Sequence, residues 1–214
     1  MMRIEKIEKK DERNVTITFE DGEKLYLAYD IFLKNGLRKN EEISESRFAL
    51  LIEENQKFHL KQKAFTYLGR RLHSAYELKI KLRQKGYNPD FIAQVVDELK
   101  SGKYVNDYEF ASLYADENIR NKLWGRKKLE AELFKKGIDR NIIAQVADEK
   151  FPAGSEFDKA LELGGKKIKS LKSRGMDNEK LRTKLISFLI TKGYDYDVCR
   201  RVTDTLIGDS DFVE

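Results

Sequence analysis

Few residues in this chain have the type and spacing that an active site needs. The one cysteine, Cys199, follows Val198 at a core-facing position, so we interpret it as a buried structural thiol and not as a nucleophile. His59 and His73 are fourteen residues apart and belong to no cluster of histidines and cysteines, which disfavours a metal site. A single cysteine also excludes an internal disulfide and is typical of a reducing compartment.

Two further patterns resemble a catalytic carboxylate pair and a phosphate-binding loop, but neither is complete. Asp107 and Glu109 look like paired carboxylates, but Asp107 stands where a helix beginning at Tyr108 needs an N-cap, so we favour capping. The run from Gly164 to Lys167 lacks the full phosphate-loop pattern and does not follow a strand. We therefore predict no catalytic residue, no metal and no cofactor, and we expect function to lie on a surface.

Positive charge is concentrated in particular segments. The net charge is only +5, yet nine Lys or Arg stand against one acid between Lys57 and Lys85, and eight stand against three between Asn118 and Arg140. Such segments suit a phosphate backbone or an acidic protein groove, although a solvated helix surface is the alternative. The residues that we select from them by charge are Arg70, Arg71, Lys79, Arg83, Arg120, Arg126, Lys127 and Lys128.

A repeated hydrophobic frame must position these charges. A Lys-Gly pair followed by an apolar residue occurs at Gly86, Gly137 and Gly193, spaced 51 and 56 residues apart. Leucines precede each glycine by eight and four residues, and Val95, Val146 and Val202 follow by nine. The last shared column holds Asp97, Asp148 and Asp204. Repetition at this period predicts a tandem array in which each unit packs on its neighbours.

Each unit is predicted to hold three helices. Leucines four residues apart give a helix one apolar stripe, and glycine after lysine ends it in a left-handed conformation, as we expect for Gly137. A second helix follows, capped by Asn88, Asp139 or Asp195. A further apolar helix precedes each pair, over residues 64–72, 110–119 and 160–171. The predicted segments are an N-terminal piece, 1–58, and three repeats, 59–107, 108–152 and 153–214.

The N-terminal segment differs in kind. Residues 15–19 and 25–27 alternate with period two around Asp21-Gly22, which predicts a β-hairpin, and Ile4 and Ile7 add a possible third strand. Asp30 and Ser44 are candidate caps of a short helix ending at Asn35-Gly36 and of a long one. The long helix either runs unbroken into the first repeat or breaks near His59. The predicted fold is mainly α: three-helix repeats in an elongated, curved array with a small β-hairpin and helix appendage.

Composition gives the remaining expectations. No run approaches the ~20 apolar residues of a membrane helix, and the charged start lacks the apolar region of a signal peptide. We expect a cytoplasmic, monomeric protein that is not an enzyme.

Three stretches resemble the RecX family of recombination regulators. They are Ser74–Tyr87, which carries a Leu-x-x-x-Leu frame before Lys-Gly-Tyr, the junction phrase Tyr104–Ala111, and the second Lys-Gly unit, Gly125–Ile138. The resemblance covers roughly residues 60 to 150, and the third repeat agrees in frame.

This resemblance implies an all-helical protein that binds the RecA recombinase, lodges in the groove of the RecA–DNA filament and mainly inhibits its activities, in homologous recombination, DNA repair and the SOS response. It supplies no catalytic residues. The eight basic residues named above are then the expected contacts with RecA and DNA, with weak, sequence-independent DNA binding. Two alternatives stay open: a helix-turn-helix-like DNA-binding module unconnected with RecA, and a repeat scaffold for some other acidic protein.

Overall fold

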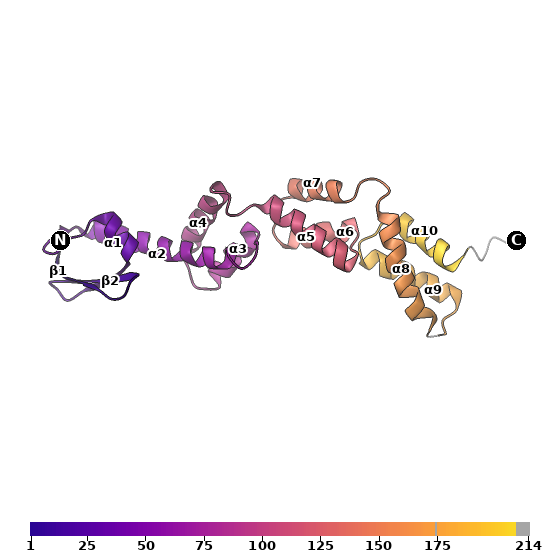
Figure 1. Ribbon diagram of the computed structural model, residues 1–214, viewed down its shortest axis with the longest axis horizontal. Coiled ribbons are helices and arrows are strands. Elements are labelled where there is room, and N and C mark those ends of the chain that lie inside the picture. The colour runs from indigo at the N-terminus through magenta and orange to yellow at the C-terminus, as the bar shows by residue number, and fades with distance from the viewer. Residues whose placement is uncertain (174, 209–214) are drawn as a thin grey trace. The chain divides into compact units, whose positions relative to one another are not determined.

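The structure is a computed structural model that describes residues 1–173 and 175–208 (Figure 1). Its contacts divide the chain into two compact units. Unit 1 comprises Met1–Leu72 and Leu78–Val105, and unit 2 comprises His73–Glu77 and the chain from Asn106 onward. The last predicted segment, 153–214, includes residue 174 and residues 209–214, which lie outside the described residues.

Unit 1 begins with a four-stranded antiparallel sheet in the order β3-β2-β1-β4. The strands are β1 (Met2–Lys9), β2 (Asn14–Phe19), β3 (Lys24–Ala28) and β4 (Glu42–Ile43). Alternation decides which face is buried: Val15, Ile17 and Phe19 are buried while their neighbours in β2 are half-buried. The predicted hairpin and third strand are confirmed. β4 was not predicted, because two residues are too few to show a period.

Two helices complete the N-terminal part of unit 1. α1 (Tyr29–Asn35) follows β3 directly, so its N-cap is Ala28 and the predicted cap, Asp30, is wrong; Asp30 lies in the first helical turn. α2 (Glu45–Leu68) begins at Ser44, whose side chain accepts a hydrogen bond from the Arg47 amide at 3.2 Å, as predicted. α2 is unbroken over 24 residues, which decides between the two alternatives for this helix. It packs on the sheet through an edge-on contact of Phe48 with Phe19.

α3 (Ala75–Arg83) and α4 (Pro89–Ser101) follow α2. The helix expected over 64–72 is α2, which ends four residues earlier, at Leu68. α4 packs on α2 within unit 1, and its buried face comprises Ile92, Val95, Val96 and Leu99. Asn88 caps α4 and Pro89 occupies its first turn, as predicted.

Unit 2 contains two helix triplets (Figure 1). The first is α5 (Asp107–Lys122), α6 (Arg126–Lys135) and α7 (Arg140–Lys150), and the second is α8 (Glu156–Lys172), α9 (Asn178–Thr191) and α10 (Tyr196–Ile207). In the second triplet, α10 packs on both α8 and α9. Gly164 lies in α8, and a Cβ there would be 3.0 Å from Leu206 Cδ1 and 3.2 Å from Val202 Cγ1. The glycine that weakens this helix by propensity therefore lets α10 approach closely.

The predicted caps of unit 2 have different outcomes. α5 begins one residue earlier than expected, so Asn106 is its N-cap and accepts hydrogen bonds from the Tyr108 and Glu109 amides. The predicted cap, Asp107, is wrong: its carboxylate accepts a hydrogen bond from the Ala75 amide at 2.8 Å, at the start of α3. Asp139 caps α7 as predicted. Asp195 occupies the N-cap position of α10, as predicted, but its side chain makes no capping hydrogen bond. The mainly α fold of three-helix repeats with a small β-containing N-terminal part is confirmed.

Candidate binding surface

Four of the candidate residues lie in the loop after α2 and on α3. Arg70 and Arg83 are exposed, and neither has an ion pair within the described residues. Arg71 donates a hydrogen bond to the Leu72 carbonyl at 2.7 Å. Lys79 Nζ lies 3.8 Å from Asp97 Oδ1, which is a long contact between two partly exposed groups. Arg70 and Arg83 are thus the two candidates of unit 1 whose charge is least compensated.

Arg120 lies in the last turn of α5 and is exposed. In the part of the chain that the structure describes, no carboxylate pairs with it. A cation at the carboxyl end of a helix is favoured by the helix dipole, so its position is stable without an acidic partner.

Arg126, in contrast, is held inside unit 2 by carboxylates. Its Nε donates to Glu130 Oε1 at 2.8 Å and a terminal nitrogen donates to Asp148 Oδ1 at 2.6 Å. The hydrogen bond to Asp148 raises the pKa of the Arg126 guanidinium above its ordinary value. The Arg126 amide donates to Glu156 Oε1 at 3.0 Å, and burial raises the pKa of the Glu156 carboxyl. The guanidinium of Arg126 therefore connects α6 to α7, and its backbone amide connects α6 to α8.

Lys127 and Lys128 are also paired. Lys127 Nζ forms an ion pair with Asp195, the residue expected to cap α10, and this pairing raises the pKa of Lys127. Lys128 Nζ lies 3.1 Å from Glu132 Oε1 and 5.9 Å from the centre of the Trp124 ring. Because both amines have a carboxylate at short range, the local excess of positive charge is smaller than the sequence indicates.

Ion pairs also explain why an aspartate recurs eleven residues after the glycine in the second and third repeats. Asp148, eleven residues after Gly137, pairs with Arg126, eleven residues before it. Asp204 and Arg182 occupy the same two places around Gly193 and pair at 2.6 Å. An ion pair between the second and third helices thus recurs in two repeats. It is a signal in the sequence that marks Arg126 as structural.

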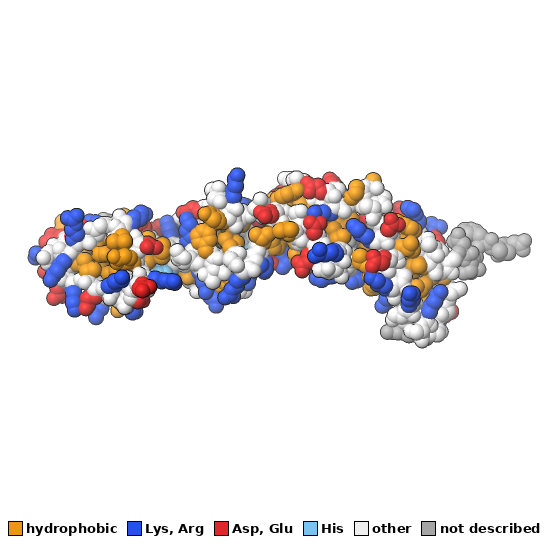
Figure 2. All heavy atoms as spheres, in the orientation of Figure 1, with side chains coloured by type: hydrophobic (Ala, Val, Ile, Leu, Met, Phe, Trp, Pro, Cys, Tyr) orange, Lys and Arg blue, Asp and Glu red, His pale blue; other side chains and the backbone are white. Residues whose placement is uncertain are grey.

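Figure 2 shows how these charges are distributed. Over α5, α6 and α7, Lys and Arg side chains are mixed with Asp and Glu, and hydrophobic side chains lie between them. Around α3, Lys and Arg side chains gather along one edge. The two basic segments of the sequence therefore differ: the first presents less compensated charge than the second.

Comparisons with known proteins follow the helix triplets. Residues 61–99 match the first three-helix domain of RecX, residues 106–146 the second and residues 155–203 the third. Together these matches cover more than half of the chain, in order. The chain belongs to the RecX family.

Individual RecX proteins are similar along nearly the whole chain. "Regulatory protein RecX" of Clostridium perfringens (strain 13) is 27% identical over 200 residues, which is 94% of this chain and 93% of that protein. The protein of the same name from Clostridioides difficile (strain 630) is 28% identical over 206 residues, 96% of this chain and 95% of that one.

Two crystal structures share the fold. One, a regulatory protein RecX, gives a TM-score of 0.78 at 21% identity and covers 95% of this chain and 100% of its own; at this identity it is evidence for the fold alone. RecX from Lactobacillus salivarius gives 0.63 at 25% identity, covering 72% of this chain and 97% of its own.

The residues of this RecX-family chain that could do chemistry are poorly placed for it. Cys199 is buried, which raises the pKa of its thiol to about 11, so the thiolate is scarce at neutral pH. The described residues contain no group of three or more His, Cys, Asp or Glu able to hold a metal ion. Nor is any described helix both long and apolar enough to span a membrane.

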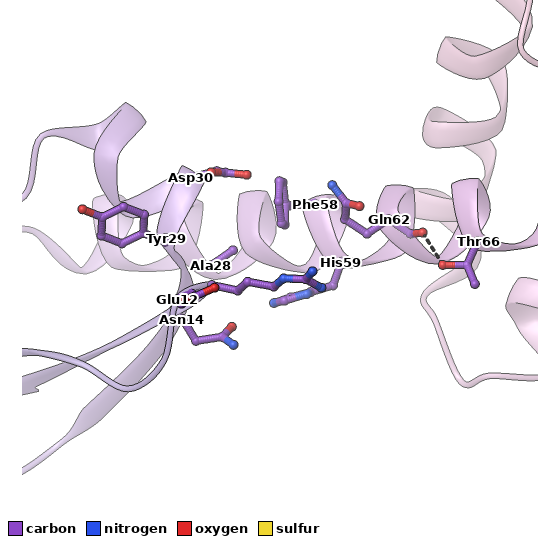
Figure 3. Close-up of a pocket in the computed structure, with 10 residues that line it drawn as sticks. Glu12, Asn14, Ala28, Tyr29, Asp30, Phe58, His59, Gln62 and Thr66 are labelled. Atoms are coloured by element: carbon purple, nitrogen blue, oxygen red, sulfur yellow. Dashed lines mark hydrogen bonds between the residues drawn. The ribbon is translucent and has the colours of Figure 1, made fainter. Parts of the chain in front are cut away.

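A hollow of about 450 Å³ lies in unit 1 between the sheet and α2 (Figure 3). His59, Gln62 and Thr66 project from α2 on one side of it, and Asn14 and Tyr29 lie on the other. Thr66 Oγ1 donates to the Gln62 carbonyl at 2.9 Å, a bond internal to the helix. The hollow was not predicted, since its lining comes from residues far apart in the sequence.

Proposed function

We propose that this chain regulates the RecA recombinase, mainly as an inhibitor, by lodging in the groove of the RecA–DNA filament. The observation that carries the proposal is the ordered match of all three helix triplets to the RecX domains. The relatives are named regulatory proteins, and the described residues hold no metal cluster that would favour catalysis. We further propose that the chain acts as a monomer in the cytoplasm and binds DNA weakly and without sequence preference.

The proposed contacts are the eight basic residues selected from the sequence, four in unit 1 and four in unit 2, and we rank them by how far carboxylates already compensate their charge. Arg70, Arg83 and Arg120 are exposed and have no carboxylate partner within the described residues, so each offers a full charge to a phosphate or an acidic side chain. Arg71 and Lys79 are secondary contacts on the same basis. Arg126, Lys127 and Lys128 would first have to release the carboxylates that hold them, so we assign them a smaller share of the binding energy.

The proposal is tested by the ATPase activity of RecA on single-stranded DNA, measured with and without the purified protein. We expect inhibition by the wild-type chain, and at least tenfold weaker inhibition by the double variant Arg70→Glu/Arg83→Glu. Lys24→Glu/Lys39→Glu is the matched control, because it makes the same change of charge at exposed positions of unit 1. Inhibition should also weaken as salt rises, because each counterion released on binding gains less entropy when the surrounding salt concentration is higher.

The outcomes separate the proposal from its alternatives. If wild-type protein leaves the ATPase unchanged but binds duplex DNA tightly, the helix-turn-helix-like reading replaces it. That reading is disfavoured by Asp97 and Glu98, exposed carboxylates of α4 that would face the phosphates. If both double variants inhibit like wild type, RecA regulation stands and the basic surface is elsewhere.

A further inference from the structure

The three Lys-Gly turns of this chain are equivalent in sequence but differ in what contacts them. In each, the glycine has a positive φ: 81° for Gly86, 70° for Gly137 and 91° for Gly193. Two of these turns are covered by the beginning of a helix from the preceding repeat. The first turn, at Gly86, is not covered by any described residue.

The turn at Gly137 receives the start of α3. Ser74 Oγ donates to the Lys136 carbonyl at 2.7 Å, and the Ser74 hydroxyl in turn accepts a hydrogen bond from the Glu77 amide at 3.0 Å. Glu77 Oε1 lies 2.6 Å from Lys136 Nζ. A Cβ on Gly137 would be only 2.3 Å from the Cβ of Tyr76, so no larger residue fits here without movement. Ser74 thus caps the start of α3, and Ser74 and Glu77 together hold the Lys-Gly pair through its carbonyl and its amine.

The turn at Gly193 receives the start of α6 in the same way. The Gly125 amide donates to the Lys192 carbonyl at 2.8 Å, and the Lys127 amide donates to the Gly193 carbonyl at 3.1 Å. A Cβ on Gly193 would be 2.2 Å from the Lys128 nitrogen. In both covered turns, therefore, the lysine carbonyl accepts a hydrogen bond from an N-cap residue, Ser74 or Gly125, and the glycine permits close contact.

Within the described residues, no helix start covers the turn at Gly86. A Cβ on Gly86 would find nothing within 4 Å, and Lys85 and Gly86 are both exposed. Lys85 has no ion pair within the described residues, whereas the equivalent Lys136 pairs with Glu77. The Lys-Gly pattern is thus present at this turn, although no described residue packs against the Gly86 position or pairs with the Lys85 amine.

A second copy of this chain does not fit the open turn by the same contact. The third repeat would have to supply the start of α9 for this contact. α9 begins fifteen residues before its glycine, at Asn178, whereas α3 and α6 begin eleven residues before theirs, so α9 is one turn longer. Leu181 occupies the place of Ser74 and Gly125, and it is buried inside the helix. The described part of the chain thus offers no third helix start of the right kind.

We infer that the Lys85–Gly86 turn is a docking site for the first turn of a helix in another protein. The occupant begins with a small or hydroxyl N-cap, as in Ser74 and Gly125, which donates to the Lys85 carbonyl. An acidic residue three positions later pairs with Lys85, as Glu77 does with Lys136. This inference rests on the proposed function, because it takes RecA as the protein that supplies the helix.

The test compares Gly86→Asn with Gly36→Asn in binding to RecA filaments on single-stranded DNA, followed by fluorescence anisotropy of labelled protein. Asparagine tolerates a left-handed backbone, and nothing lies within 4 Å of either position, so both variants should fold and melt like wild type. Gly36 also ends a helix at φ 60°, which makes it a matched control. We expect at least tenfold weaker binding for Gly86→Asn, an intermediate loss for Lys85→Ala, and no change for Gly36→Asn.

The outcomes are distinguishable. If wild type and Gly86→Asn bind the filament equally, the docking inference is overturned while RecA regulation stands. If wild type does not bind the filament, the proposed function fails, and the assignment of a RecA helix fails with it. If sedimentation shows that wild type self-associates and Gly86→Asn does not, the occupant is a second copy, contrary to the inference.

Discussion

The partners of Arg126 determine whether its charge is available to bind another molecule. Selected from a basic run, it lies between Glu130 and Asp148 and is only about one-third exposed, at 33%. Lys127 and Lys128 beside it are paired with Asp195 and Glu132. Reversing all three charges would therefore place new carboxylates beside existing ones. We therefore expect such a triple variant to be less stable than wild type.

A comparison of two arginines measures this effect. Arg126→Ala should lower the stability of the protein by roughly 1 kcal/mol, because two partly exposed ion pairs are lost. Arg120→Ala removes the same charge from an exposed position without a described partner and should change stability by less than about 0.5 kcal/mol. Urea denaturation of both variants checks the difference. Equal midpoints would show that the Arg126 pairs contribute nothing measurable.

Glu156 gives a prediction about pH. Burial raises the pKa of its carboxyl above 4.5, so the folded protein holds this proton more tightly than the unfolded chain does. As pH rises from the unfolded pKa through the folded one, the unfolded chain loses its proton first, and stability from this group is lost. Glu156→Gln removes that cost. We expect the variant to melt above wild type at pH 7 and the gap to shrink towards pH 4, followed by thermal unfolding across this range.

A gap that stays constant with pH would exclude a titration of Glu156 as its cause. Asp158→Asn is the control, because Asp158 is exposed in the same first turn of α8.

In the Lys-Gly turns, the glycine can be needed for its backbone conformation or for close packing, and the sequence pattern is the same in both cases. The positive φ is needed at all three, because each glycine ends a helix. The absence of a side chain is needed for packing only at Gly137 and Gly193, where the start of a helix from the preceding repeat leaves no room for a Cβ. The expectation that Gly137 is left-handed is confirmed, but its replacement by asparagine would meet Tyr76 whatever the backbone tolerates.

Alanine at two of these turns separates the conformational cost from the packing cost. Gly86→Ala and Gly193→Ala both force an alanine to a similar positive φ, at a cost on the order of 1 kcal/mol each. Only at Gly193 does the new Cβ collide with backbone, so Gly193→Ala should lose roughly 1–3 kcal/mol more. Denaturation by urea gives both values. Identical losses would mean that the start of α6 moves away at no cost.

At the scale of the whole chain, each unit has a hydrophobic core of its own. The core of unit 1 lies between the sheet and α2 and includes Ile17, Phe19 and Leu51. Unit 2 has separate clusters in its two helix triplets, around Leu133 in one and Leu189 in the other. The four predicted segments, with boundaries at residues 58, 107 and 152, stay a prediction. The accessibility of the backbone to a protease at each boundary tests it.

Limited proteolysis is the measurement. The turn at Pro152, Ala153 and Gly154, between α7 and α8, is exposed and not helical, so we expect the first cleavage at residues 152–155. The boundary at residue 58 lies inside α2, which continues to Leu68, so we expect no early cleavage there. Mass spectrometry of the first fragments identifies the site. Early cleavage near residue 58 would instead show that α2 opens there.

Some features of this protein are determined by the sequence because they depend on neighbours a few residues apart. Leucines four residues apart form the helix faces, glycine ends a helix by its own conformational freedom, and Asp21-Gly22 closes the hairpin. Repetition of the same local pattern then identified three helix triplets and the family.

Other features were decided only by the tertiary structure, since they depend on residues that folding brings together. The free or paired state of a cation is one, because an ion pair requires a few ångströms between groups such as Arg126 and Asp148, 22 residues apart. The covered or open state of a Lys-Gly turn is another, because the cap that covers Lys136 comes from Ser74, 62 residues away. A Lys-Gly turn thus ends a helix in every repeat, but contacts between residues far apart in the sequence decide whether another helix packs on it.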